Sequence, residues 1–393
     1  MTGTPKTTMA GIPLTPSTAD RVTKARVLRT QMASQDASVP APPQITNGDE
    51  QRYSDKSGTY TKAVLQSGIG LVDPAAYLTF KKALDSGNPA DFEKIILGGP
   101  RTLNGPQGGL AFDLECLDSS QFAPPPAPAV ASEEYATELV ELYWASLLRD
   151  VAFTNYPANS VAAQAANELS SMPAYKGPRD GSNQVTPALL FRGGYQNLFP
   201  GETVGPYLSQ FLLKKTDFGS LPVDQKYVTL QPNVDYMTDA TTFQQVQNGQ
   251  STGKSLQFGP QVYLRDGRGL GAYTHDDVLY EAYFMAYLVM NTIGVPLNPG
   301  NPYIGSKTQN GFNTMGQPDF AATLTSVASE ALKAVWYQKW YVHLRHRPES
   351  GGALVHLVNS GQGSTVQAHP SPTVLNSQAV QASFGKYGSY FLS

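Results

Sequence analysis

Cysteine and charge are both scarce in this sequence. The only cysteine among 393 residues is Cys116, so an internal disulfide is impossible and a disulfide-stapled scaffold is excluded. Because no Cys-His signature surrounds it, Cys116 is predicted to be a small buried hydrophobic residue and not a nucleophile. Charged residues make up 15% of the chain, against roughly 25% in an average soluble protein. The net charge of −3 gives no reason to expect nucleic acid or an anionic membrane as a partner.

Long apolar runs are absent as well. The longest, residues 282–290, would cover about half of a bilayer, and it predicts a buried core helix. No signal peptide is visible in residues 1–8, so no membrane association and a cytoplasmic location are the default expectations. The composition, with 40% hydrophobic residues, 36 glycines and 30 prolines, excludes a disordered chain, a coiled coil and a collagen-like fibre.

The chain is expected to consist of a leader and one domain. Residues 1–45 are rich in Thr, Pro, Ser and Ala and end in a proline-rich run, which predicts a flexible leader. Residues 46–393 are predicted to form a helical domain, long enough to bury about three-quarters of its unfolded surface.

Hydrophobic periodicity predicts a mainly α fold, a helical bundle with a minor β-hairpin. Ser132 can cap a helix that runs to Leu148 and is apolar on two sides, as a central helix would be. Further helices are predicted from about residue 276 to 290 and from 319 to about 346, the second ended by Pro348. Residues 228–230 and 261–265 are candidate hairpin strands. The glycine-rich residues 267–271 are interpreted as a turn, and the chain beyond residue 351 as loop.

The generic catalytic motifs are missing, but one basic segment is conspicuous. There is no phosphate-binding Gly-rich loop with a following Lys, no Gly-x-Ser-x-Gly and no His-Glu-x-x-His. Residues 336–348 carry three cations and two imidazoles within nine positions and no acid: Lys339, His343, Arg345, His346 and Arg347. One interpretation is a solvated basic face over packed aromatic residues. The other is an oxyanion pocket, in which Lys supplies a point charge and Arg a bidentate fork.

At this segment the sequence resembles the vanadium-dependent haloperoxidases, in particular the bromoperoxidases of algae and cyanobacteria. Lys339, followed eight residues later by Arg347-Pro348, is similar to the first active-site motif of that family. The resemblance continues upstream, in the same order, in residues 110–115, 125–128, 141–143, 190–193, 204–210, 235–239 and 279–283. Helical phase alone would place Arg347 some 80° from Lys339. However, a residue before proline leaves α geometry, which allows Arg347 to turn back.

The resemblance implies a fold, a cofactor and a reaction. The fold is the helical-bundle architecture of the family, here incomplete. The cofactor is vanadate, bound by Lys339 and Arg347 with Trp336 and His343 nearby, and the reaction is oxidation of bromide or another halide by hydrogen peroxide. No direct metal ligand is assigned, because the family's Ser-Gly-His stretch and vanadium-bonding histidine lie downstream and neither motif occurs in these 393 residues. Resemblance to oligomeric algal enzymes implies a homo-oligomer.

These departures from the family pattern leave alternatives open. The site is expected to be half-formed and the chain inactive alone, unless His343 or His346 replaces the missing ligand. Trp336 stands where algal bromoperoxidases tend to have Arg and fungal chloroperoxidases Trp, so the halide is undecided. Calcium is not expected, because residues 297–318 contain no Asp or Glu. Two other functions remain possible: an acid-phosphatase-like hydrolase, whose related superfamily shares a similar motif, and a non-catalytic helical assembly protein.

Overall fold

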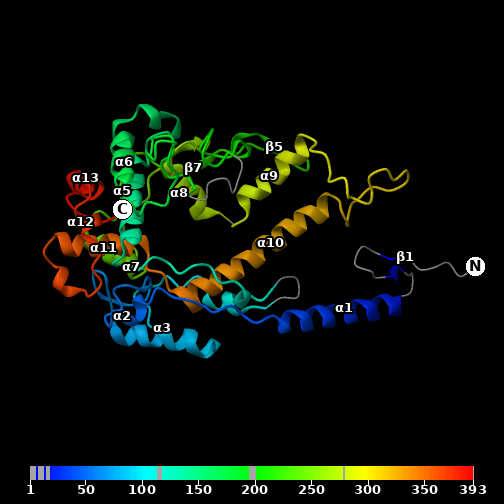
Figure 1. Ribbon diagram of the computed structural model, residues 1–393, viewed down its shortest axis with the longest axis horizontal. Helices are drawn as coiled ribbons and strands as arrows, with labels where there is room; N and C mark the ends of the chain where they lie inside the picture. Colours follow the sequence, from blue (N-terminus) through cyan, green and yellow to red (C-terminus); the bar gives the residue numbers. More distant parts are fainter. Residues whose placement is uncertain are drawn as a thin grey trace, which may run out of the picture.

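The computed structural model describes residues 6–7, 13–14, 18–112, 117–193, 201–277 and 279–392, so Cys116 lies outside the described residues. The fold is mainly α with short strands, which confirms the predicted class (Figure 1). The α-helices are α1 (Thr18–Ser38), α2 (Asp49–Arg52), α3 (Pro74–Ser86), α4 (Pro89–Phe92), α5 (Glu133–Leu148), α6 (Ser160–Ser170), α7 (Ala240–Gln247), α8 (Gly267–Asp276), α9 (Glu281–Thr292), α10 (Gln317–Tyr337), α11 (Pro348–Asn359), α12 (Pro372–Leu375) and α13 (Gln378–Tyr387).

The remaining elements are short. The strands form antiparallel pairs: β1 (Lys6–Thr7) with β2 (Pro13–Leu14), β3 (Gln66–Gly68) with β4 (Leu71–Val72), β5 (Thr216–Phe218) with β6 (Leu221–Val223), and β7 (Tyr227–Leu230) with β8 (Phe258–Val262). The last pair confirms that the two predicted segments pair in antiparallel fashion, but helix α7 lies in their connection, so they form no hairpin, and the second strand begins and ends earlier than expected. The 3₁₀ turns are η1 (Pro106–Leu110), η2 (Ser119–Gln121), η3 (Phe153–Ala158), η4 (Gln210–Leu213) and η6 (Gly363–Thr365), and η5 (Gln338–His343) is π-helical.

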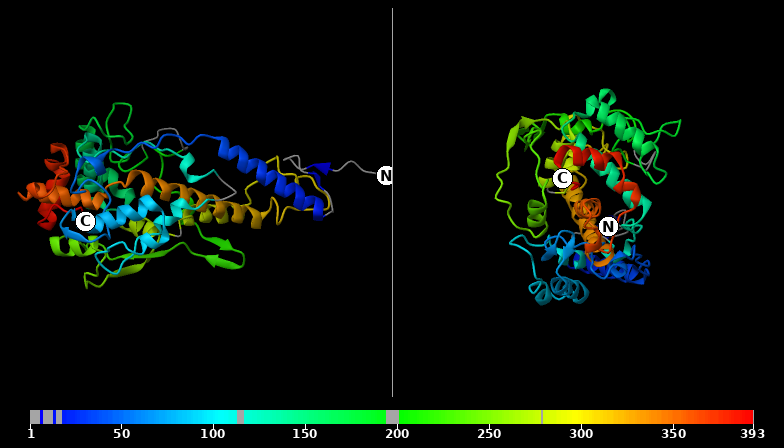
Figure 2. Two further views of the ribbon diagram at one scale, coloured as in Figure 1. Left: turned by 90° about the horizontal axis from the view of Figure 1, so that it is seen from below. Right: turned by 90° about the vertical axis from the view of Figure 1, so that its left-hand side faces the viewer.

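The molecule is elongated, with most helices packed at one end. Helices α5, α6 and α11–α13 gather there, with α2, α3 and α7 beside them (Figure 1). From this end α10 and α1 extend in the same direction (Figure 2). The two hydrophobic clusters that bear on the candidate site lie at this packed end and at the base of α10.

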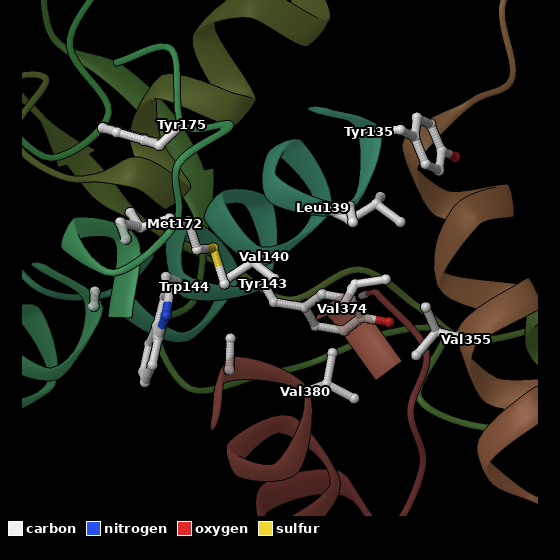
Figure 3. Close-up of a cluster of buried hydrophobic side chains, with 14 of the residues drawn as sticks. Tyr135, Leu139, Val140, Tyr143, Trp144, Met172, Tyr175, Val355, Val374 and Val380 are labelled. Carbon is white, nitrogen blue, oxygen red and sulfur yellow. The ribbon is translucent and has the colours of Figure 1, made fainter. Parts of the chain in front are cut away.

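Helix α5 is at the centre of the main core, as its two apolar stripes predicted. Ser132 caps it by accepting a hydrogen bond from the Tyr135 backbone N–H at 3.1 Å. Its side chains Leu139, Tyr143 and Trp144 pack between α6 on one side and α11–α13 on the other (Figure 3). Burial of each large apolar side chain contributes about 1.5–3 kcal/mol, so this helix anchors the fold.

The prediction that the chain beyond residue 351 is loop is wrong. That stretch contains most of α11, then η6, α12 and α13. Proline is favourable at the first helical position, so Pro348 begins α11 and does not simply end α10. Gly351 and Gly352 also led to the wrong prediction, because glycine usually indicates a loop. A Cβ atom at Gly351 would collide with Tyr135 of α5, and one at Gly352 with Leu392, so both glycines permit close packing.

Two further predictions about local structure are wrong. Residues 267–271 form the first part of α8, whose start is capped by the Asp266 carboxylate accepting from the Gly269 N–H at 2.8 Å. The predicted leader contains the 21-residue helix α1, because its middle includes several Arg, Ala and Gln residues, which favour helix. The prediction gave too much weight to the Thr and Pro residues at its two ends.

Helices α9 and α10 are less buried than expected. The run 282–290 does lie in a helix, α9, but only Leu288 and Val289 of that helix are fully buried. In α10 only Ala328 is buried, while Val327 and Val335 are 62% and 56% exposed. Within the described residues, no helix has the combined length and apolarity needed to cross a bilayer.

Candidate functional site

A break in regular helix brings the basic segment together. After α10 the chain winds into the π-helical turn η5, closed by a hydrogen bond from the Leu344 N–H to the Lys339 carbonyl at 3.1 Å. Leu344 adopts a left-handed conformation with φ of 42°, and its carbonyl accepts from both the N–H of Tyr60 and the hydroxyl of Thr59, each at 2.9 Å. Such π turns are frequent at functional sites. The extended Arg347 follows and leads into α11, as expected for a residue before proline.

Lys339 is a partly buried cation surrounded by aromatic rings. Its Nζ atom lies 4.5 Å from the ring centroid of Trp340, 4.8 Å from that of Trp336 and 5.6 Å from that of Tyr60. Within the part of the chain that the structure describes, no carboxylate pairs with it. Burial lowers the pKa of Lys339, and the positive charges of Arg347 and Lys62 lower it further. The ammonium group therefore lies close to other cations.

Arg347 is held by a carboxylate that it shares with Lys62. The Arg347 Nε donates to Glu349 Oε1 at 3.1 Å, and the Lys62 Nζ donates to the same oxygen at 2.7 Å. Burial alone would raise the pKa of Glu349, but Lys62 and Arg347 hold it down at about 2, so this carboxylate is ionised at any physiological pH. Only the Nε of Arg347 bonds to a described residue, which leaves both terminal nitrogens for a ligand.

Lys339, His343 and Arg347 line one cleft of about 700 Å³ between the base of α10, α5 and the proline-rich stretch. Trp336 does not line this cleft. It contacts the Lys339 side chain, and its Nε1 donates to the Asn104 carbonyl at 2.7 Å. The further lining residues are Tyr60, Pro124, Pro125, Ala127, Glu138, Glu141, Leu142, Val335, Gln338, Arg345, His346 and Pro348.

The two histidines of the segment differ in environment. The His346 Nδ1 lies 2.7 Å from the Tyr135 hydroxyl in a buried pair, and burial lowers the pKa of His346 to about 4. His346 therefore has a structural role. Both ring nitrogens of His343 are buried and have no hydrogen-bond partner among the described residues. Burial, and then the charge of Arg345, lower the pKa of His343.

The buried His346 should make folding sensitive to acid. Its pKa is lower in the folded state, at about 4, than in the unfolded chain, at about 6.5, so below pH 6.5 the unfolded state binds more protons. We expect the stability of the wild type relative to His346→Gln to fall as the pH drops from 6.5 to 4. Urea unfolding at several pH values measures this difference. The exposed His275→Gln serves as control, and a pH-independent difference would contradict the assignment.

Sequence reasoning missed the acidic part of the site. Glu138 and Glu141, three residues apart on α5, both face the cleft, and Glu138 pairs with Arg345. Burial raises the pKa of Glu141 to about 7, because the hydrogen bond from Tyr175 only partly offsets it. The i, i+3 spacing could have placed the two glutamates on one helix face. Nothing local could have paired the distant Lys62 with Glu349.

Known proteins with sequences similar to this chain belong to a class that agrees with the observed fold. The chain is 30% identical to the vanadium-dependent bromoperoxidase of Corallina pilulifera over 80% of its own length. It is also 30% identical to the vanadium-dependent bromoperoxidase of Ascophyllum nodosum over 81% of its length. No family model matches the sequence. Homologues about 30% identical over some 80% of this chain are therefore vanadium-dependent bromoperoxidases.

A solved structure supports the same conclusion. The homohexameric second vanadate-dependent bromoperoxidase (AnII) from Ascophyllum nodosum superposes with a TM-score of 0.84 at 28% identity, over 98% of this chain and 66% of that one. The chain spans 64% of the length of the Corallina relative and 58% of that of the Ascophyllum relative.

Proposed function

We propose that the cleft binds vanadate and that the chain contributes to peroxide-dependent oxidation of bromide or another halide. The observation that carries this proposal is the environment of Lys339. A partly buried ammonium without a carboxylate partner, repelled by a neighbouring guanidinium, is costly unless an anion lies beside it. Vanadate is a multiply charged oxyanion, and an oxyanion in the cleft would offset the repulsion between the two cations.

The residues that line the cleft fit this group. Lys339 offers a point charge, and the two terminal nitrogens of Arg347 offer a fork that matches two oxygens of an oxyanion. Glu349 fixes the guanidinium from its Nε side, and the aromatic rings of Trp340, Trp336 and Tyr60 surround the Lys339 ammonium. When bound, vanadate supplies Lewis-acid activation of peroxide. The chain's own residues bind and orient the anion.

Removal of Lys339 should weaken anion binding. A charge-assisted hydrogen bond contributes about 1.5–3 kcal/mol. Lys339→Ala is therefore expected to raise the dissociation constant of sulfate or vanadate about 10- to 150-fold. Lys94→Ala, which removes an exposed lysine of a surface ion pair, is the control and should change it little. Titration calorimetry measures both, and equal affinities of Lys339→Ala and the wild type would refute the proposal.

Glu141 should make anion binding depend on pH. Its pKa is about 7, so below that pH the group is neutral, and above it a carboxylate repels an anion in the cleft. We expect sulfate, whose own charge is constant in this range, to bind more weakly at pH 8 than at pH 6. Glu141→Gln should flatten that dependence. A variant with the same pH profile as the wild type would show that Glu141 is not responsible.

We further propose that the protein is a homo-oligomer. An apolar hollow of about 830 Å³ lies along α10, where Val327 and Val335 are more than half exposed. Exposed apolar surface of this kind commonly marks a protein interface. The Ascophyllum structure described above is homohexameric. Light scattering should therefore give a mass well above 42.3 kDa, and a stable monomer of that mass would contradict the proposal.

A further inference from the structure

His343 lies between two separate cavities. One is the cleft that contains Lys339 and Arg347, and the other is a smaller and more enclosed cavity of about 190 Å³ lined by residues 340–344 together with α2 and α3. His343 is the one described residue that lines both. Its two ring nitrogens are both buried and have no hydrogen-bond partner among the described residues. Buried polar atoms in native proteins nearly always have a partner, so these two nitrogens require an explanation.

The smaller cavity is polar and suited to water. Its lining includes Glu50, Gln51, Lys81 and Asp85, from α2 and α3. Trp340, whose side chain is 1% exposed, also lines it, and its indole Nε1 is buried without a partner in the described part of the chain. A cavity of this size and polarity has room for several water molecules. It offers them a buried indole N–H, an imidazole and two carboxylates.

The proposed reaction needs a proton at the cleft. Oxidation of a halide by hydrogen peroxide breaks the O–O bond and forms an oxygen–halogen bond. The halide is oxidised, the peroxide is reduced, and one proton converts the departing hydroxide to water. A neutral imidazole has one N–H donor and one acceptor nitrogen on different edges of the ring, so it can accept a proton on one side and release it on the other.

We propose that His343 relays protons between the polar cavity beside α2 and α3 and the anion cleft. The inference rests on the proposed function of the cleft and adds the route by which its proton arrives. When an anion occupies the cleft, its negative charge favours the imidazolium form of His343, and the polar cavity supplies the proton. His343 is thus a proton-relay residue, while Lys339 and Arg347 bind the anion.

Charged groups face His343 from both sides, and they set the conditions for a test. On the cleft side they are Lys339, Arg345, Arg347, Glu138, Glu141 and His346, and on the side of the smaller cavity they are Glu50, Lys81 and Asp85. Arg345 pairs with Glu138, and Lys81 with Asp85. Glu141 and Glu50 are therefore the acids, one on each side, whose charge is not already offset by an ion pair with a described residue.

The experiment follows the ring nitrogens of His343 by nitrogen-15 NMR in the full 393-residue chain labelled at histidine. Loss of one signal in His343→Gln assigns it among the five histidines. Saturating sulfate should convert His343 from neutral to cationic near pH 6.5. Glu50→Gln and Glu141→Gln should each shift its titration midpoint, because the ring contacts both cavities. Glu134→Gln, on α5 with its side chain 45% exposed, is the matched control and should not.

The outcomes separate this inference from the proposed function. If Lys339→Ala does not weaken sulfate binding, the anion cleft is wrong and the relay is overturned with it. If sulfate binding depends on Lys339 but His343 stays neutral, only the relay is overturned. A midpoint that responds to Glu141→Gln but not to Glu50→Gln would also overturn it, because the ring would then communicate with the cleft alone.

Discussion

A polypeptide of these 393 residues is expected to oxidise bromide no faster than buffer does, even with vanadate and peroxide present. Lys339 and Arg347 offer charge-assisted hydrogen bonds of about 1.5–3 kcal/mol each, or about 3–6 kcal/mol together. That corresponds roughly to millimolar affinity for a well-hydrated anion. The family resemblance implies that a downstream histidine makes the bond to vanadium, and no Ser-Gly-His stretch occurs in this sequence.

Two histidines of the basic segment, His343 and His346, could replace that histidine as the vanadium ligand, and the structure shows the environment of each. His346 is buried and its Nδ1 contacts the Tyr135 hydroxyl at 2.7 Å, so only its Nε2 is left for a ligand. His343 lines the cleft with both ring nitrogens unpaired among the described residues. His343 and the Nε2 of His346 are therefore the two local candidates, and the absence of activity is expected because neither lies in the Ser-Gly-His or later His motif of the family.

A bromination assay with a phenol indicator tests this expectation. A segment that carries the Ser-Gly-His stretch and the later histidine, fused or added as a second polypeptide, should restore vanadate-dependent turnover. Robust turnover by the isolated chain, abolished by Lys339→Ala, would contradict the prediction. Hydrolysis of p-nitrophenyl phosphate without vanadate would instead favour the acid-phosphatase alternative.

The second large effect is expected for Trp340, whose side chain belongs both to the buried cluster at the base of α10 and to the surroundings of Lys339. Its side chain is 1% exposed and packs edge-on against Tyr60 and Phe80, with centroids 5.0 and 6.2 Å away. It also forms one wall of the aromatic surroundings of Lys339. Replacement of a buried Trp by Ala costs about 3–5 kcal/mol, a large share of the 5–15 kcal/mol by which most proteins are stable.

We therefore expect Trp340→Ala to lower the free energy of unfolding by about 3–5 kcal/mol in urea titrations. Leu78→Ala is the matched control on the neighbouring helix α3, because Leu78 is 69% exposed. It should change stability by at most about 0.5 kcal/mol. Equal effects of the two substitutions would mean that the cluster at the base of α10 does not stabilise the fold.

The sequence predicted the parts of the fold that depend on local periodicity. Helix α5 was found from Ser132 and its apolar stripes, and the pairing of β7 with β8 from two candidate strand segments. The prediction from sequence failed where tertiary packing, and not local periodicity, determines the structural role of a residue. Gly351 and Gly352 indicated a loop, but in α11 they allow contact with α5 and the C-terminal segment. The burial of α9 and α10 also depends on neighbours that periodicity does not identify.

For the site, spacing predicted the residues and the structure supplied their surroundings. Lys339 and Arg347 were selected from one motif and line one cleft, although their role in binding stays a prediction. Tyr60, Lys62 and Glu349 enter through contacts between segments nearly 290 residues apart, such as the Lys62–Glu349 ion pair. The π turn η5 follows α10, and the hydrogen bond from the Tyr60 N–H to the Leu344 carbonyl fixes its end. No local sequence pattern indicates this bond.

The most direct test is a crystal structure of the chain grown with vanadate. The account predicts a tetrahedral anion in the cleft, within hydrogen-bond distance of the Lys339 Nζ and a terminal nitrogen of Arg347, with anomalous scattering that identifies vanadium. Anion density elsewhere, or an Arg347 head group too far from Lys339 for one anion to reach both, would contradict it.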